Sequence, residues 1–137
     1  QIYSLIFPDA TIVKTGSKTA EMVKYFTNTF LATKVSFANE MKLICDKLNI
    51  DYDKVVEYST YDERLGKSHW AVPGPDGKLG FGGSCFPKDI RALIHLCDEL
   101  EIPESVLSSV WDTNLTVRPE EDWKELKGRA VVDEEKA

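Results

Sequence analysis

One run of helical apolar spacing covers residues 17–49 and limits the folds open to this chain more than any other feature. We expect Ser17 or Thr19 as its N-cap, and large apolar side chains recur at steps of three, four or seven residues: Phe26, Phe30, Phe37, Met41, Ile44 and Leu48. A helix of this length is far above the average of about 11–12 residues. In a chain of only 137 residues, we expect so long a helix to pack against the same helix of a second copy, in a homodimer.

Three shorter helices follow in the pattern, over residues 51–61, over 87–100 and from Pro103 onward. The expected fold class is therefore all-α, with one long helix, three shorter helices and a glycine-rich loop. We expect residues 1–16 to form an opening segment and residues 17–117 the helical domain. Residues 118–137 are charged and form either a tail or the start of a further domain.

Composition and charge exclude several classes of protein. The formal net charge of −6 argues against a nucleic-acid-binding surface, which is normally basic. No apolar stretch approaches the length that a membrane span needs. His69 and His95 have no carboxylate or cysteine at metal-ligand spacing, so we expect no metal site. Three cysteines without a C-x-x-C pair favour a reducing, cytoplasmic location, with Cys45 and Cys97 in the core.

The segment Gly80-Phe-Gly-Gly-Ser-Cys85 closes a long loop that starts at Arg64 and precedes the expected third helix. Loops beyond about 12–15 residues in a compact domain are usually functional or disordered. Unpaired N–H groups at a helix start, together with Lys88, stabilise a thiolate, so we expect Cys85 to be a nucleophile. The glycines do not form a dinucleotide fingerprint, because the third glycine and a strand-turn-helix unit are lacking.

Three polar residues accompany Cys85 as candidates for chemistry. Lys24 and Asn28 are four residues apart and share one face of the long helix, while Asp89 lies four residues after Cys85. Each has an ordinary structural alternative. Lys24 and Asn28 can be a surface lysine beside a surface amide, Asp89 can simply stabilise a helix dipole, and Cys85 can be an inert thiol. The functional interpretation requires these residues to meet.

Three ordered motifs resemble the central domain of the UDP-glucose/GDP-mannose dehydrogenase family, and the resemblance covers residues 17–114. The motifs are Lys24-x-x-x-Asn28-x-Phe30-Leu31-Ala32-x-Lys34-x-Ser36-Phe37-x-Asn39-Glu40, Asp62-x-Arg64-Leu65-Gly66 and Gly80-Phe-Gly-Gly-Ser-Cys85-Phe-Pro-Lys-Asp89. The residues of the second and third motifs are more similar to the UDP-glucose branch of the family than to the GDP-mannose branch. The resemblance implies a helical domain that dimerises through its long helix.

The resemblance also implies a reaction, the NAD-dependent oxidation of UDP-glucose to UDP-glucuronate. Cys85 matches the nucleophile that carries a thiohemiacetal and then a thioester. Lys24 would stabilise the developing oxyanion, Asn28 would orient the C6 oxygens or the water, and Asp89 would assist that water in hydrolysis.

Substrate contacts follow from the same resemblance. Arg64 would reach across the dimer to the partner's substrate, and four loop residues would line the sugar nucleotide: Phe81, Gly82, Gly83 and Ser84. The loop between Arg64 and Cys85 looks longer than the family's usual one, so we expect the turn over residues 73–77 to alter substrate contacts.

The family's NAD-binding domain is not visible in this sequence. We therefore expect no cofactor-binding residues here, no turnover by this chain alone, and a separate NAD-binding domain as a partner. Two alternatives stay open: a non-catalytic helical dimerisation module derived from the family, and a thiol enzyme of another kind.

Overall fold

The computed structural model describes residues 5–126. The chain is helical, as the sequence predicts, and no strand occurs within these residues. Its elements are α2 (Ser17–Leu48), α3 (Tyr52–Ser59), the 3-10 helix η1 (Glu63–Leu65), α4 (Phe86–Glu99), α5 (Ser105–Val117) and the 3-10 helix η2 (Asp122–Glu125). The expectation of one long helix and three shorter ones is confirmed. None of the helices in the described part combines the length and apolar character needed to cross a bilayer.

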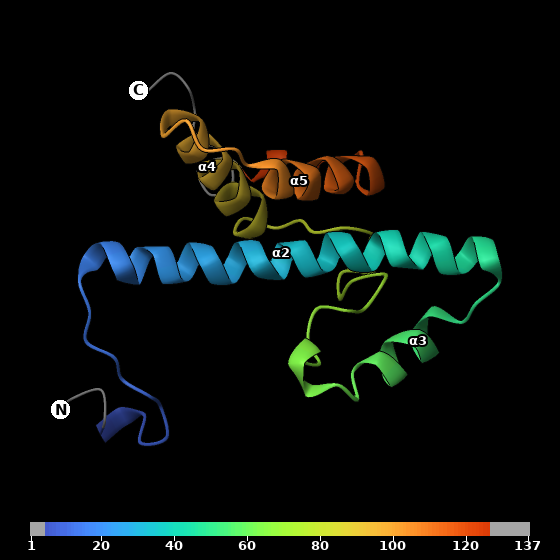
Figure 1. Ribbon diagram of the computed structural model, residues 1–137, viewed down its shortest axis with the longest axis horizontal. Coiled ribbons are helices and arrows are strands. Elements are labelled where there is room, and N and C mark those ends of the chain that lie inside the picture. Colours follow the sequence, from blue (N-terminus) through green and yellow to red (C-terminus); the bar gives the residue numbers. More distant parts are fainter. Residues whose placement is uncertain (1–4, 127–137) are drawn as a thin grey trace.

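The long helix α2 forms the axis of the molecule, with α4 and α5 on one side and α3 and η1 on the other (Figure 1). It begins after Gly16 without a side-chain cap, so the expectation that Ser17 or Thr19 caps it is wrong. It ends at Asn49, whose left-handed conformation lets the chain turn back while Ile50 N–H donates to Cys45 O at 2.9 Å. The residues along α2 therefore determine where the elements on its two sides pack.

Each side of α2 has its own small core. The core toward α4 and α5 is built on Ala32, Phe81, Ile90 and Val110, and the core toward α3 on Ala38, Cys45, Tyr52 and Val72. Both cores take an alanine from α2, and so small a side chain allows the neighbouring elements to approach the helix closely. Apolar burial on two sides explains why a single long helix can organise a chain of this size.

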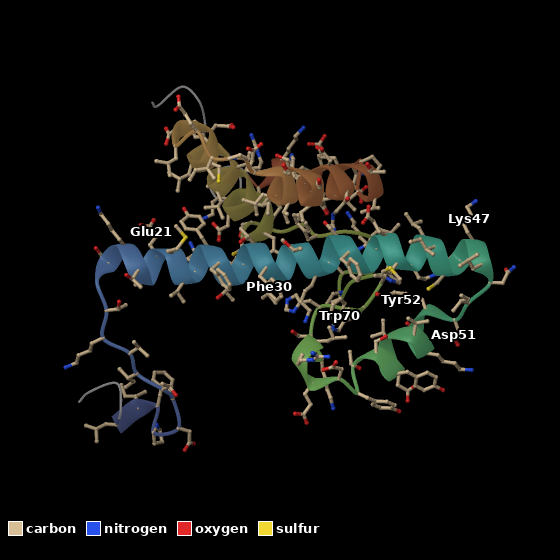
Figure 2. The ribbon with its side chains drawn as sticks, viewed as in Figure 1. Glu21, Phe30, Lys47, Asp51, Tyr52 and Trp70 are labelled. Carbon is tan, nitrogen blue, oxygen red and sulfur yellow. The ribbon has the colours of Figure 1, made fainter. Side chains whose placement is uncertain are left out.

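Most large apolar residues of α2 lie outside both cores, although Val35 and Met41 pack against them. Phe26 is 71% exposed, Phe30 58% and Phe37 54%, and Figure 2 shows Phe30 on the open side of the helix. The buried positions of α2 are mainly small or polar: Thr29, Ala32, Lys34, Ser36, Ala38, Asn39 and Cys45. The apolar period thus predicted the helix correctly but marks a face that one copy of the chain leaves uncovered.

Two buried asparagines hold the glycine-rich segment in place. Phe81 N–H donates to Asn114 Oδ1 at 2.7 Å, and Asn114 Nδ2 donates back to Phe81 O at 3.0 Å. Asn39 of α2 accepts a hydrogen bond from Gly80 N–H at 3.2 Å. Gly80 has a φ of +64°, and a Cβ there would lie 2.4 Å from Asn114 Oδ1. Only glycine fits this position, so the loop and α5 are matched to each other.

The residues after α5 fold back onto the same loop through Arg118. Its side chain is 2% exposed and donates to Asp122 Oδ2 at 2.7 Å and to Asp76 Oδ2 at 2.8 Å. A Cβ on Gly82 would lie 2.5 Å from the guanidinium, so the loop passes directly over it. Hydrogen bonds from Arg118 hold the pKa of Asp122 well below its usual value. Trp123, which follows in η2, is 1% exposed and anchors this segment.

Replacing Asn114 with alanine will destabilise the chain, because it leaves the buried N–H and C=O of Phe81 without partners. We expect the free energy of unfolding, measured by urea titration, to fall by about 2–4 kcal/mol. Thr116→Ala on the exposed face of the same helix is the control and should change it by less than about 0.5 kcal/mol. A loss below about 1 kcal/mol for Asn114→Ala would show that the loop is held by other contacts.

Candidate active site

A fully buried carboxylate, Asp89, lies where α4 meets α2. Asn28 Nδ2 donates to Asp89 Oδ2 at 2.6 Å, and Lys24 Nζ lies 3.9 Å from the same oxygen. The Asp89 side chain is 0% exposed, whereas that of Lys24 is 54% exposed. A spacing of four residues places Lys24 and Asn28 on one face of α2, as expected. The structure therefore brings three of the predicted site residues together across two helices.

The second oxygen of Asp89 faces Lys88. From the sequence, Lys88 was expected only to add positive charge near Cys85. Lys88 Nζ lies 3.1 Å from Asp89 Oδ1. This oxygen accepts no well-aligned hydrogen bond from a described residue, so the contact is an ion pair. The contact with Asp89 raises the pKa of Lys88, and burial opposes the shift. Two ammonium groups and one amide thus surround one buried carboxylate.

Cys85 occupies the N-cap position of α4, where the sequence placed it. Asp89 N–H donates to Cys85 O at 2.9 Å, so the two residues are one helical turn apart. The thiol is exposed, and its sulfur lies 3.9 Å from Ser84 Oγ. The expectation that the other cysteines lie in the core holds for Cys45, which is buried, and is wrong for Cys97, which is half-buried. Cys85 is therefore the accessible thiol of the described chain.

The predicted substrate-contacting residues of the loop differ in exposure. Phe81 is 4% exposed and its ring packs in the core against Phe86 and Trp111. Gly82 and Ser84 are half-buried, and Gly83 is exposed. A cavity of about 490 Å³ is lined by Phe81, Gly82 and Gly83, but not by Ser84. The surface that the loop offers to a ligand is therefore mainly backbone.

Arg64 is not brought to Cys85 within one copy of the chain. It lies in η1, on the side of α2 opposite to α4 (Figure 1), and its side chain is 88% exposed. Its guanidinium binds Asp62, with Nε donating to Oδ1 at 2.9 Å, and these hydrogen bonds lower the pKa of Asp62. Arg64 is thus presented outward, away from the Asp89 cluster.

A buried lysine, Lys34, links the segment that carries Arg64 to α2. Lys34 is part of the first family motif, but no role was assigned to it from the sequence. Lys34 Nζ donates to Leu65 O at 3.0 Å and lies 4.4 Å from the centre of the Trp70 ring. Burial lowers the pKa of Lys34. Its charge is compensated by a carbonyl and an aromatic face rather than by a carboxylate. Lys34 is therefore a structural link between the helix and the loop that carries Arg64.

Several residues that shape the site were missed by the sequence interpretation: Lys34, Asn39, Asn114 and Arg118. The available signal was weak. Asn114 stands within an apolar helical pattern, where a polar residue suggests a buried hydrogen-bonding role. Arg118 follows the last helix in a charged stretch and looks like any solvated charge. These residues act through contacts with segments far away in the sequence, which spacing alone does not reveal.

The described residues offer a nucleophile, cations, a carboxylate and an amide, but no metal site. No group of three or more His, Cys, Asp or Glu side chains within residues 5–126 is placed to hold a metal ion. These residues also form no strand, and so no strand-turn-helix unit of the kind that binds a dinucleotide. An exposed thiol one helical turn from a buried carboxylate that two lysines contact suits covalent chemistry at a carbonyl carbon.

Comparisons with known proteins agree on one family. A profile of the UDP-glucose/GDP-mannose dehydrogenase family, central domain, matches residues 18–116. A UDP-glucose 6-dehydrogenase of Bacillus subtilis is 39% identical over 105 residues, which cover 77% of this chain and 22% of the relative. A UDP-glucose 6-dehydrogenase of Rickettsia prowazekii is 40% identical over 115 residues, covering 83% and 25%.

A solved structure agrees with these relatives. The UDP-glucose dehydrogenase of the hyperthermophilic archaeon Pyrobaculum islandicum superposes with a TM-score of 0.75 at 36% identity, over 84% of this chain and 25% of that protein. The chain spans about a quarter of the length of the relatives that it matches. By sequence and by structure, the chain belongs to the UDP-glucose/GDP-mannose dehydrogenase family, and residues 18–116 correspond to its central domain.

Proposed function

We propose that this chain is the substrate-binding and dimer-forming part of an NAD-dependent UDP-glucose 6-dehydrogenase. The observation that carries the proposal is the cluster of Lys24, Asn28 and Asp89 one helical turn from the exposed thiol of Cys85. Relatives named UDP-glucose 6-dehydrogenase support the choice of substrate. A reducing compartment such as the cytoplasm suits an enzyme that depends on a free thiol.

Cys85 forms the covalent bond in the proposed reaction. Its thiolate adds to the C6 aldehyde of the sugar, so a carbon–sulfur bond forms and the carbonyl electron pair moves onto oxygen. The ammonium of Lys24 stabilises that oxyanion, since a fixed cation near developing charge lowers the barrier most in a partly desolvated site. Asn28 has one amide hydrogen on Asp89, and the rest of its amide is available to orient the oxygen at C6.

Asp89 takes part in the hydrolysis of the thioester. A water molecule attacks the acyl carbon, its proton passes to the Asp89 carboxylate, and the carbon–sulfur bond breaks to release the Cys85 thiolate and the sugar carboxylic acid. Lys24 and Lys88 contact the two oxygens of Asp89 and so fix the position of its carboxylate beside the thioester. Asp89 therefore combines a structural position with a proton-accepting role.

NAD supplies the oxidising power when bound, because two hydrides must leave C6 between alcohol and carboxylate. Residues 5–126 do not fit this cofactor, since they contain no strand-turn-helix unit and their glycine-rich loop is held by asparagine side chains. We therefore assign no hydride step to these residues. The alternative of a non-catalytic dimerisation module shares the fold, and in it the Asp89 cluster would serve only to pack α4 against α2.

Replacing Cys85 with serine will abolish oxidation of UDP-glucose to the acid, because a hydroxyl is a much weaker nucleophile than a thiolate at neutral pH. We expect NADH formation by the full-length polypeptide that carries these residues to fall at least about 10³-fold. Cys97→Ser, at a half-buried thiol of the same helix, is the control and should retain activity. Absence of UDP-glucose-dependent NADH formation in the unaltered protein would reject the proposed activity.

The dimer belongs to the same proposal. Phe26, Phe30 and Phe37 expose apolar surface along one long helix, and patches of this kind usually mark contact sites. Arg64 lies on the side of α2 away from Cys85 and is 88% exposed, which leaves it free to meet a substrate held by a second copy. Pairing of α2 with its equivalent would cover the phenylalanines and complete the site with Arg64 of the other chain.

Phe30→Glu will convert the dimer into a monomer, because it places a charge in the centre of the proposed contact while one copy of the chain already leaves this position 58% exposed. Light scattering should give about twice 15.5 kDa for the unaltered chain and 15.5 kDa for the variant. Leu100→Glu, equally exposed at the end of α4, should remain dimeric. A mass near 15.5 kDa for the unaltered chain at high concentration would contradict the dimer.

A further inference from the structure

The cavity of about 490 Å³ beside the glycine-rich loop has one wall to which the proposed mechanism assigns no role. Its sides come from Val35 of α2, from Gly82 and Gly83, and from Phe86 at the start of α4. The remaining wall is the loop after η1, including His69. The loop therefore adds a titratable side chain to the space next to the candidate active site.

His69 is held in an uncommon backbone conformation. Its φ is +68°, a region that residues other than glycine seldom occupy and that tends to persist only where neighbouring contacts enforce it. Those contacts are present at the next residue: Trp70 Nε1 donates to Gly66 O at 2.7 Å, and Trp70 O accepts from Tyr52 Oη at 2.7 Å. Figure 2 shows Trp70 and Tyr52 on the same side of α2. The position of His69 is thus fixed from outside the cavity.

The imidazole of His69 packs against one aromatic ring, but its nitrogens bind no other residue of the described chain. Its ring centre lies 5.9 Å from that of Phe86, with the planes inclined by 40°. The side chain is exposed and makes no hydrogen bond with another described residue. The backbone N–H groups of Gly82 and Gly83, which also line the cavity, donate to no described residue either. Asp76 lines the cavity too, but Arg118 Nη2 binds its carboxylate at 2.8 Å.

The distances along the chain match the length of a sugar nucleotide. Gly83 precedes Cys85 by two residues, which span at most about 7 Å, close to the length of a hexose ring. Val35 follows Asn28 by seven residues, or about 10 Å along the axis of α2. Cys85 and Asn28 do not line the cavity, but at these spacings a sugar with its C6 beside them can place its diphosphate in the cavity that Gly82, Gly83 and His69 line. Free N–H groups in a glycine-rich loop suit an anion of this kind.

We propose that His69 is a specificity-determining residue that donates a hydrogen bond to the diphosphate of the sugar nucleotide. This inference rests on the proposed function and extends it to a residue of the long loop. An ordinary alternative is that the ring only fills space against Phe86. The two explanations differ in whether the ring nitrogens matter, and this can be tested.

Steady-state kinetics of the full-length polypeptide with UDP-glucose will separate them. His69→Ala and His69→Phe should both raise KM about tenfold or more, because each removes a hydrogen bond to a charged group, while kcat changes less than about twofold. The inhibition constant of UDP should rise in parallel, and that of uridine, which lacks the diphosphate, should not. His95→Ala removes the only other histidine, which is exposed on α4 beside Glu99, and should leave every constant unchanged.

Each other outcome is decisive. Unchanged KM in both variants overturns the role of His69 but leaves the dehydrogenase activity intact. Normal kinetics in His69→Phe together with a raised KM in His69→Ala shows that the ring acts by filling space, and also overturns the proposal. Absence of UDP-glucose-dependent NADH formation in the unaltered protein removes the proposed function and this inference with it. Equal thermal midpoints of the variants guard against a folding defect.

Discussion

The carboxylate of Asp89 is buried where α4 packs against α2, with a side chain that is 0% exposed. Such a group is costly unless cations and hydrogen-bond donors surround it. Asn28 and Lys24 reach it from α2, and Lys88 from its own helix, at 2.6, 3.9 and 3.1 Å. Because these partners come from two helices, the charge fixes how α4 lies against α2. The thiol of Cys85, one turn before Asp89, takes its position from the same contact.

The glycine-rich loop needs a comparable constraint, since glycine leaves the backbone unusually free. Asn39 from α2 and Asn114 from α5 bind its backbone, and Arg118 supports it where Gly82 leaves room for the guanidinium. All three side chains are buried. The loop is therefore held by polar side chains rather than by apolar packing alone, and its outer surface remains open to a ligand. This division between a fixed inner side and an open outer side is what a binding loop requires.

Local patterns predicted the helices well, because period and turn chemistry determine them. The apolar spacing of Phe26, Phe30 and Phe37 predicted α2. The residues around Cys85 and Pro87 predicted where α4 begins. The cluster of Lys24, Asn28 and Asp89 followed from the family resemblance, and the structure brings these residues together.

Long-range contacts were not predictable in the same way. Arg118 looks like a solvated charge in the sequence, and only the fold shows it buried between Asp76 and Asp122. The same limit applies to Cys97, whose helical spacing suggested the core although α4 leaves it half-buried. Whether a helix face is buried depends on the segment that returns to cover it, and spacing within the helix does not contain that information.

The central claim is that Cys85 bonds covalently to the oxidised sugar, and trapping that bond tests it most directly. Asp89→Asn keeps the shape of the side chain but removes the group that accepts the proton of the attacking water, so the thioester should accumulate. After mixing the full-length variant with UDP-glucose and NAD and quenching with acid, peptide mass spectrometry should find the UDP-glucuronyl group on the peptide containing Cys85. An acyl group on Cys45 or Cys97, or on no cysteine while the acid product still forms, would contradict the account.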